Sequence, residues 1–408
     1  MPQICLYLQL HQPYRLGDFD LFDIGSEISY FDAADKHNAK IFKKVARKSY
    51  LPMLRLLLQL SKASPSFKLA LSASGIFLEQ AMAFEPKIIK ILKLLAKSQQ
   101  VEFLAETYYH SLSSLYSEKE FEEQVAKHSK VIKKLFGVSP IVFRNTELIY
   151  SNDIAKLVEK LGFTGVLTEA VPRYLKSRPR TKIYKSSTKA SLPLLLKHAQ
   201  LSDDIAFRFS DPNWSDYPIS ASKYFTWLNK YHEDAIINLF MDFETFGEHQ
   251  WKDTGIFDFF KKLVKKISKS KTSCFKTPSE LFNSILTSDG QVEAMVERVY
   301  DVPEPISWAD VDRDLTAWLD NDLQQDSISK LYELEDQILK SKDQKLLEDW
   351  RKLQCSDHFY YMCTKWAADG DVHAYFSPYD SPLEAYRKYS IVLADLAGRL
   401  KNHPEKEA

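Results

Sequence analysis

The sequence is poor in glycine and contains none of the glycine-rich loops that cradle phosphate groups. Only 11 of its 408 residues are glycine, and neither GxGxxG nor GxxxxGKS/T occurs. The four cysteines, Cys5, Cys274, Cys355 and Cys363, form no CxxC pair. We therefore predict that the protein uses no cofactor, and we expect its cysteines to be reduced thiols in a cytoplasmic protein.

Excess charge and long apolar runs are also missing. Lys and Arg together number 55, as do Asp and Glu, so nothing indicates nucleic acid or another polyanion as the partner. No uncharged apolar stretch approaches the ~18 residues that a membrane span requires. The N-terminal MPQICLYLQLHQP lacks a basic start and is interrupted by His-Gln-Pro, which predicts a first strand and not a signal peptide. We expect a cytoplasmic protein without a membrane partner.

Short apolar runs alternate with longer helical patterns before residue 250. The predicted strands are residues 4–10, 67–73, 101–106, 141–145, 162–169, 205–210 and 235–242. Amphipathic helices are predicted between them, at residues 87–98, 120–137, 152–162 and 222–233. This alternation is typical of an α/β fold with parallel strands and right-handed crossovers. Seven strands favour either a barrel or a large open sheet.

The rest of the chain has a different pattern. Residues 171–204 contain KIYKS and LPLLLKH, which could form an added hairpin, and residues 273–280 could form a further strand. Beyond about residue 290, three segments have helical patterns, at residues 314–341, 345–367 and 381–400. We therefore predict a first domain at 1–290, which carries the site, and a helical bundle domain at 291–408 that packs on it and contributes to its cleft.

Polar side chains follow the predicted strands at the points where the strands end. In parallel β/α folds the loops at the carboxyl ends of the strands converge, and reactive groups gather there. The residues in question are His11 and Gln12, Glu79, Glu106 and His110, Arg144 with Asn145 and Glu147, and Asp242 with Glu244. We expect at least six ionisable groups to face one cleft.

Two of these carboxylates, Glu147 and Asp242, lie on different strands and suit the cleavage of a glycosidic bond. In that chemistry one carboxyl group protonates the leaving oxygen, and the other acts as nucleophile or base. Arg144 would lower the pKa of Glu147, whereas the acids around Asp242 would raise the pKa of that residue. The pattern thus predicts one ionised and one protonated carboxyl group.

Five ordered segments closely resemble glycoside hydrolase family 57, whose members include α-amylase-type enzymes acting on α-glucans. The segments are LHQPYRL (10–16), SGIFLEQ (74–80), FRNTELIY (143–150), MDFETFGEHQW (241–251) and DRDLTAWLDND (312–322). The resemblance implies a seven-stranded β/α barrel, a distorted relative of the TIM barrel, followed by a helical domain. It also implies a retaining mechanism on starch, glycogen or maltooligosaccharides.

The resemblance also implies roles for individual residues. Glu147 matches the nucleophile and Asp242 the acid/base. Substrate-binding positions, including possible aromatic walls, are predicted at His11, Gln12, Glu79, His110, Arg144, Trp214, Trp251, Asp314 and Trp318. For a retaining enzyme the carboxyl oxygens of Glu147 and Asp242 should lie ~5–6 Å apart. We also expect Trp251 and Trp318 to line the same cleft, which should hold no catalytic metal.

One position departs from some members of the family. Family glucanotransferases carry a second histidine two residues before the HQP, where this sequence has Gln9. The difference favours the α-amylase-like branch, with a 4-α-glucanotransferase as the alternative. A non-catalytic α-glucan-binding protein on the same fold is a further possibility. A metal-dependent polysaccharide deacetylase is disfavoured because the segment 110–116 lacks the second histidine at helical spacing that its metal would need.

Overall fold

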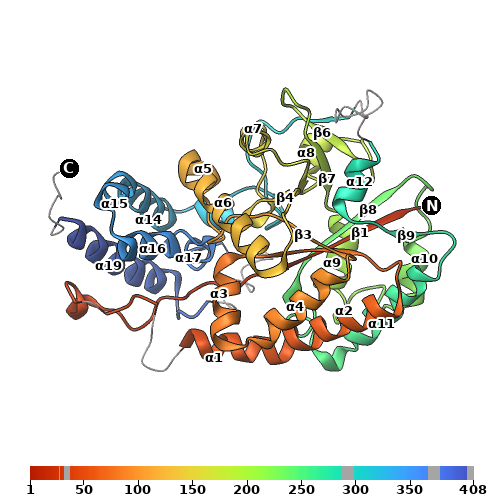
Figure 1. Ribbon diagram of the computed structural model, residues 1–408, viewed down its shortest axis with the longest axis horizontal. Coiled ribbons are helices and arrows are strands. Elements are labelled where there is room, and N and C mark those ends of the chain that lie inside the picture. The colour runs from red at the N-terminus through yellow and green to blue at the C-terminus, as the bar shows by residue number, and fades with distance from the viewer. Residues whose placement is uncertain (27, 32–36, 286–297, 366–376, 402–408) are drawn as a thin grey trace.

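The computed structural model describes all residues except 27, 32–36, 286–297, 366–376 and 402–408 (Figure 1). Its strands form two sheets of five strands each. The first sheet has the order β3-β2-β1-β8, and β9 also pairs with β1. The bounds are β1 (Gln3–Leu10), β2 (Leu69–Ala73), β3 (Val101–Phe103), β8 (Ile236–Asp242) and β9 (Cys274–Phe275).

The second sheet has the order β10-β6-β7-β5-β4. Its strands are β4 (Phe143–Arg144), β5 (Val166–Thr168), β6 (Tyr184–Ser186), β7 (Pro193–Leu196) and β10 (Val299–Tyr300). Within it only the β6–β7 pair is antiparallel, and this pair is the hairpin that the sequence predicts at KIYKS and LPLLLKH.

The two sheets touch but do not close into one continuous barrel. On one side they meet at an isolated parallel bridge between Ala105 and Phe143. On the other side the backbone N–H of His198, after β7, donates to the carbonyl of Asn238 in β8 at 2.8 Å. The prediction of parallel strands is therefore confirmed, whereas the closed seven-stranded barrel is not.

One predicted strand is wrong. Residues 205 and 206 end a helix, α9 (Ala199–Ala206), and residues 207–210 form turns after it. His198 caps this helix by accepting from the backbone N–H of Leu201. Leu201 and Ile205, four residues apart, are both buried in the same apolar cluster, which is helical spacing. The parallel strand of this part of the chain is β7, in the segment predicted only as half of a hairpin.

Side chains alternate along the strands between two apolar layers. In β1, Cys5 and Tyr7 lie in the cluster between the sheets, together with Leu167 and Phe240. The intervening residues of β1 face helices that cover the outside. These helices include α2 (Leu51–Ala63), α4 (Lys87–Lys97), α10 (Ala221–Leu228) and α11 (Ile256–Ser268), and three of them, α2, α4 and α11, lie along one side of the strands in Figure 1.

The four helices predicted in this part of the chain are present. Three have small shifts at their ends, whereas the one predicted at 222–233 ends at Leu228 as α10. The segment at 120–137 forms α6 (Glu118–Phe136), which ends at Gly137 with a φ of 77°, the left-handed conformation that glycine adopts without strain. The remaining helices of this part are α1 (His37–Val45), α3 (Gly75–Phe84), α5 (Ser113–Tyr116), α7 (Asn152–Lys160), α8 (Pro172–Leu175) and α12 (Pro278–Asn283). Among the described residues, none of the helices has the length and apolar character that crossing a bilayer requires.

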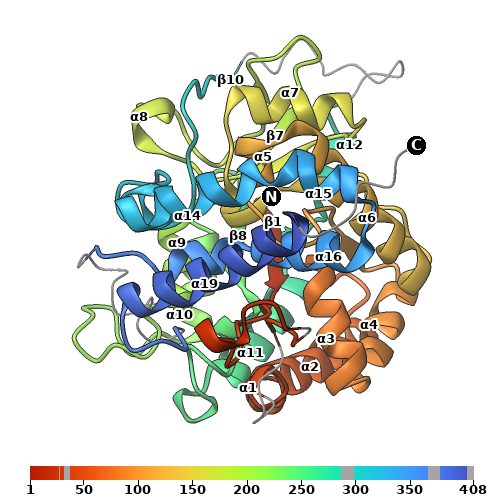
Figure 2. The same cartoon turned by 90° about the vertical axis from the view of Figure 1, so that its left-hand side faces the viewer.

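The C-terminal helices gather at the end of the molecule opposite the N-terminus of β1 (Figure 1), and in Figure 2 they face the viewer with β1 behind them. They are α13 (Thr316–Leu319), α14 (Asp322–Glu333), α15 (Glu335–Ser341), α16 (Gln344–Leu353), α17 (Ser356–Tyr360) and α19 (Pro382–Lys401). The last residues of the predicted helix at 345–367 lie outside the described part of the chain.

This helical region is not a bundle with a core of its own. Its buried residues, such as Leu331, Trp350 and Leu396, belong to one apolar cluster that also contains Phe121 and Val158 from the first part of the chain. The predicted boundary at residue 290 lies outside the described residues. Among the described residues beyond it, Val299–Tyr300 still forms a strand of the second sheet, and the first α-helix begins at Thr316.

Candidate active site

The carboxyl ends of neighbouring strands bring most of the predicted site residues together. In the first sheet, Gln9 of β1 pairs with Ser72 of β2 on one side and with Asp242 of β8 on the other. Glu147 lies in a short 3-10 turn directly after β4. Its φ of 55° is left-handed, a conformation that costs free energy for a residue with a Cβ and that clusters at functional sites.

Three hydrogen-bonding groups surround the Glu147 carboxylate. His110 Nε2 lies 3.1 Å from Oε1, the indole N–H of Trp308 donates to Oε2 at 2.7 Å, and the Ser356 hydroxyl donates to Oε1 at 3.3 Å. Burial alone would raise the pKa of Glu147. The hydrogen bond and charge of His110, with the charge of Arg144, outweigh burial and lower the pKa below its usual value. Glu147 is therefore ionised at neutral pH.

His110 owes its charge to two carboxylates. Its Nδ1 lies 3.3 Å from an oxygen of Glu106, and its Nε2 faces Glu147. Burial lowers the pKa of His110, but the hydrogen bonds to Glu106 and Glu147 raise it to about 9. The ring therefore carries a positive charge at neutral pH and holds the Glu147 carboxylate in its ionised form.

Arg144 supplies a second buried cation beside this group. Its side chain is fully buried, and one guanidinium nitrogen donates to the side-chain oxygen of Gln9 while the other lies 4.0 Å from Glu106. Its guanidinium also lies over the ring of Trp308, 5.0 Å from the ring centroid. Arg144 is thus held away from direct contact with solvent and acts on Glu147 through its charge.

Asp242 has the opposite electrostatic environment. Burial and the negative charge of Glu147 raise its pKa to about 6, against the lowering effect of Arg144 and two further cations. The neighbouring Glu244 is buried and accepts a hydrogen bond from the Tyr50 hydroxyl. Burial and the charge of Asp242 raise the pKa of Glu244 to about 8. A proton is therefore readily held on this side of the site near neutral pH, as the sequence predicts.

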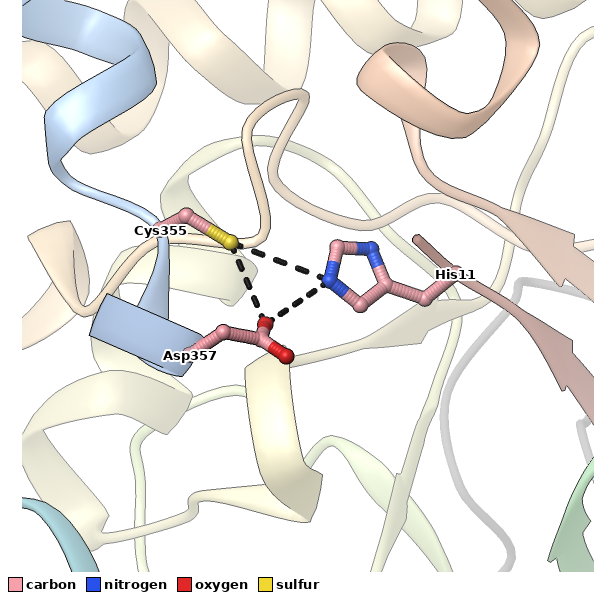
Figure 3. Close-up of side chains that lie close together, drawn as sticks. All are labelled: His11, Cys355 and Asp357. Carbon is pink, nitrogen blue, oxygen red and sulfur yellow. Dashed lines mark hydrogen bonds and ion pairs between the residues drawn. The ribbon is translucent and has the colours of Figure 1, made fainter. Parts of the chain in front are cut away.

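His11 connects β1 to the C-terminal helices. Its Nδ1 lies 2.7 Å from the Ser74 hydroxyl, its Nε2 lies 2.9 Å from Asp357 Oδ2, and its ring stacks on His110 with centroids 3.9 Å apart. Asp357 lies in α17, and Figure 3 shows it pointing at His11 together with Cys355. His11, Cys355 and Asp357 are the side chains at this site that could hold a metal ion.

Residues 355–357 and Trp308 contact the site residues Glu147 and His11, although no sequence pattern predicted it. Ser356 and Asp357 reach Glu147 and His11 from a segment with an ordinary amphipathic pattern, 209 and 346 residues away along the chain. No spacing rule could have linked them. Trp308 lies four residues before the fifth motif at 312–322. A longer definition of that motif would have included it among the candidate site residues.

Two other predicted residues make contacts near this group. Gln12 is buried, and its side-chain oxygen accepts from Arg15 at 3.2 Å. It also hydrogen-bonds Tyr50 and Glu244. Glu79, on α3, accepts from the Tyr108 hydroxyl at 2.7 Å. Gln12 therefore supports the Asp242 side of the site, whereas the structure gives Glu79 a partner outside the contacts of the two carboxylates.

Trp214 and Trp251 line two cavities that do not contain Glu147 or Asp242. Trp214 borders a cavity of about 720 Å³ together with Trp227 and Tyr231. Trp251 borders another, of about 740 Å³, where its indole is 58% exposed and Lys48 lies 5.8 Å from its ring centroid. Neither cavity is lined by Glu147 or Asp242.

The prediction that Trp318 lines the cleft is wrong. Its side chain is 1% exposed and lies in the apolar cluster of the helical region, with its ring 6.1 Å from that of Tyr360. The short helix α13 turns this residue inward, so the ring offers no face to a sugar. Asp314 acts locally, accepting from the backbone N–H of Thr316 at 2.9 Å. Residues 355–357 contribute the contacts that were expected from 312–322.

Comparisons with known proteins show the family of the chain. The family model described as glycosyl hydrolase family 57 matches residues 5–300. A Methanocaldococcus jannaschii protein named "Putative alpha-amylase" is 38% identical over 410 residues, which cover 98% of this chain and 85% of that protein.

Two solved structures have the same fold at low sequence identity. The branching enzyme of Pyrococcus horikoshii has a TM-score of 0.71 at 14% identity, covering 98% of this chain and 90% of that one. The 4-alpha-glucanotransferase of Thermococcus litoralis has a TM-score of 0.62 at 16% identity. That match covers 88% of this chain but only 56% of the glucanotransferase.

Proposed function

Because the chain belongs to glycosyl hydrolase family 57, we propose that it is a retaining glycoside hydrolase that cleaves α-glucosidic bonds, chiefly α-1,4 bonds. Its substrates would be glucans such as starch, glycogen or maltooligosaccharides, a proposal supported by the relative named "Putative alpha-amylase". Glu147 is the proposed nucleophile and Asp242 the proposed general acid and base. We no longer consider a metal-dependent polysaccharide deacetylase, because the chain belongs to glycosyl hydrolase family 57.

One observation carries the proposal: two partly buried carboxyl groups interact through their charges and have pKa values shifted in opposite directions. Glu147 is held ionised by His110, whereas the charge of Glu147 is one cause of the pKa of about 6 at Asp242. Pairs of titratable groups whose surroundings separate their pKa values are the arrangement that acid–base catalysis uses. Retaining glycosidases need one carboxylate and one carboxylic acid at the start of the reaction.

The proposed reaction has two steps. Glu147 attacks the anomeric carbon while Asp242 donates its proton to the departing glycosidic oxygen, which leaves a glucosyl ester on Glu147. The ester removes the negative charge of Glu147, so the pKa of Asp242 falls. Asp242 then accepts a proton from water as the water attacks the ester, and this step restores both groups.

The strand arrangement fits the same proposal. Strands β1 to β5 with β7 and β8 run parallel in two sheets that meet on both sides, and β9 pairs parallel with β1 as an eighth strand of this direction. We regard them as a distorted, incompletely closed barrel whose carboxyl ends carry the site. The helical region after Thr316 would form one wall of the cleft, since Ser356 and Asp357 reach the site from α17.

Trapping the intermediate tests the proposal most directly. A 5-fluoro-glucosyl fluoride of α configuration should form a long-lived ester, and mass spectrometry of a proteolytic digest should find the added glucosyl mass on the peptide containing Glu147. The variant Glu147→Gln should remain unlabelled, and the exposed Glu233→Gln should label like the unaltered protein. Label on another carboxylate would overturn the assignment of the nucleophile.

Products from maltoheptaose separate hydrolysis from transfer. A hydrolase yields only shorter oligosaccharides, whose newly formed reducing ends are first released as the α-anomer if the mechanism retains configuration. Longer oligosaccharides would instead identify a 4-α-glucanotransferase using the same two carboxylates. No turnover of any glucan by the folded protein would contradict the enzymatic proposal and favour a glucan-binding role.

A further inference from the structure

Three side chains with metal-binding atoms converge beside the carboxylate pair. His11 lies after β1, and Cys355 and Asp357 lie at the start of α17, more than 340 residues later. Cys355 Sγ lies 3.7 Å from His11 Nε2 and 3.2 Å from Asp357 Oδ2, and Nε2 lies 2.9 Å from Oδ2 (Figure 3). The three atoms form a small triangle.

The triangle differs from a catalytic triad. In a triad the nucleophile and the acid contact opposite nitrogens of the histidine ring. Here the thiol and the carboxylate approach the same nitrogen, Nε2, while the Ser74 hydroxyl lies 2.7 Å from the other nitrogen, Nδ1. The three side chains therefore face one common point, as the ligands of a metal ion do.

The separations are close to those of a tetrahedral zinc site. Zinc–ligand bonds of about 2.3 Å to sulfur, 2.0–2.1 Å to nitrogen and 2.0–2.2 Å to oxygen imply ligand–ligand distances of about 3.6 Å for the pairs with sulfur and about 3.4 Å for nitrogen and oxygen. The observed 3.7, 3.2 and 2.9 Å differ from these by about 0.5 Å or less. Small side-chain movements would accommodate an ion.

The surroundings also suit a bound ion. The contact between Ser74 and Nδ1 holds the His11 ring with Nε2 toward the cluster, the arrangement that secondary contacts of metal-binding histidines provide. Cys355 is fully buried, whereas the side chains of His11 and Asp357 are 12% and 21% exposed. An ion can therefore reach the cluster from the partly exposed side formed by His11 and Asp357, which leaves room for water as a further ligand.

We propose that His11, Cys355 and Asp357 form a site for a divalent transition-metal ion such as Zn²⁺, and that the bound ion blocks the carbohydrate site. The blocking effect rests on the proposed function, because it requires substrate to approach His11. Thiolate, imidazole and carboxylate together favour Zn²⁺ over Mg²⁺ or Ca²⁺, which prefer oxygen ligands. The ion here is an inhibitor and takes no part in bond cleavage.

Binding has a defined proton balance. The Cys355 thiol loses its proton to solvent when sulfur binds the ion. A neutral His11 moves its proton from Nε2 to Nδ1, where Nδ1–H donates to the Ser74 hydroxyl, so that the Nε2 lone pair faces the metal. Asp357 exchanges its present partners for the ion. One proton is therefore released for each ion bound.

Metal binding is tested without any measurement of activity. The purified full-length protein is stripped with a chelator, titrated with ZnCl₂ or CoCl₂, and examined by calorimetry and by the thiolate-to-cobalt charge-transfer absorption. We expect one ion per chain and the absorption in the unaltered protein and in Cys274→Ser, a matched control at a partly buried cysteine. Cys355→Ser and Cys355→Ala should lose the absorption and bind zinc at least about tenfold more weakly.

Two results would contradict the proposed metal site. Absence of a bound ion in the folded protein, or equal binding by a folded Cys355→Ser variant, would show that the cluster is only a hydrogen-bonded contact between β1 and α17. Circular dichroism establishes that each variant is folded, and the alanine variant provides a second test should the serine variant fail to fold.

The blocking effect is measured separately. Each protein's glucan turnover with zinc is compared with its own rate without zinc. Loss of turnover at zinc concentrations that fill the site, restored by a chelator and absent in Cys355→Ser, supports the proposal. Zinc binding with unchanged turnover overturns the blocking effect. A protein that binds zinc but never turns over glucan contradicts the proposed function and leaves the metal measurement intact.

Discussion

The two sides of the candidate site present the same chemical group in opposite environments. On the β4 side, Glu147 faces cations and hydrogen-bond donors, and its pKa is lowered despite burial. On the β8 side, burial and the negative charge of Glu147 raise the pKa of Asp242 to about 6, and burial and the charge of Asp242 raise the pKa of the neighbouring Glu244 to about 8. The comparison teaches that position in the sheet, and not the type of acid, separates a proposed nucleophile from a proposed proton donor.

Removing the charge of Glu147 should have the largest effect. Glu147→Gln keeps the size of the side chain but cannot attack the anomeric carbon, so we expect kcat to fall by roughly 10⁴-fold or more. Steady-state hydrolysis of maltoheptaose measures the loss, and Glu233→Gln provides the matched control. Turnover within tenfold of the unaltered protein would show that Glu147 is not the nucleophile.

Asp242→Asn, which cannot donate the proton, should reduce kcat less than Glu147→Gln does. The size of its effect should depend on how much protonation the leaving group needs. For Asp242→Asn we expect turnover of oligosaccharides to fall by about 10²- to 10⁴-fold. An aryl glucoside with an acidic phenol needs little protonation, so its bond cleavage should be affected least. An equal loss on both substrates would contradict the assignment of Asp242 as proton donor.

Asp242→Asn should raise the stability of the folded protein at alkaline pH, although it lowers activity. The pKa of Asp242 is raised from 3.8 to about 6 in the folded protein, so ionisation opposes folding, and stability is lost as pH rises from about 4 through 6. At pH 8 the variant Asp242→Asn should therefore be more stable, by up to about 3 kcal/mol. Urea unfolding at pH 4 and pH 8 measures the difference, which should vanish at the lower pH.

The pH dependence of kcat/KM reports both sides at once. Activity requires Glu147 ionised and Asp242 protonated, so the profile should be bell-shaped. Its acid limb should lie below the usual glutamate pKa, and its alkaline limb should lie near pH 6. The residual activity of Asp242→Asn on the aryl glucoside should lack the alkaline limb. A limb that persists in this variant near pH 8 would belong to Glu244 instead.

A single hydrogen bond on the β4 side should have the smallest effect. Trp308→Phe removes the 2.7 Å donation to Glu147 and keeps an aromatic ring beside Arg144. Hydrogen bonds to charged groups contribute about 1.5–3 kcal/mol, so we expect kcat/KM to fall by roughly 10- to 100-fold and the acid limb to move to higher pH. Trp251→Phe changes a ring that lies beside Lys48 in a cavity not lined by Glu147, so it should leave that limb in place.

Much of the fold could be predicted because local patterns report local structure. Apolar runs located β1 and β8 to within a residue or two, and helical periodicity located α4, α6 and α7. The predictions failed where one sequence pattern is compatible with two different structures. Ile205 and Phe207 suggest alternation, yet Ile205 belongs with Leu201 on a helix. Trp318 resembles an exposed sugar platform in sequence, but its helix turns it into the core.

The sequence by itself determined the chemistry available at the strand ends. Glu147, Asp242, His11 and Arg144 each follow or end an apolar run that forms β1, β4 or β8, and the carboxyl ends of parallel strands bring such groups together. Only the tertiary structure decided which of these groups carries a proton and which distant residues join them. A pKa depends on burial and on charges a few ångströms away, and Trp308, Cys355 and Asp357 reach those distances through packing between segments that are far apart in the chain.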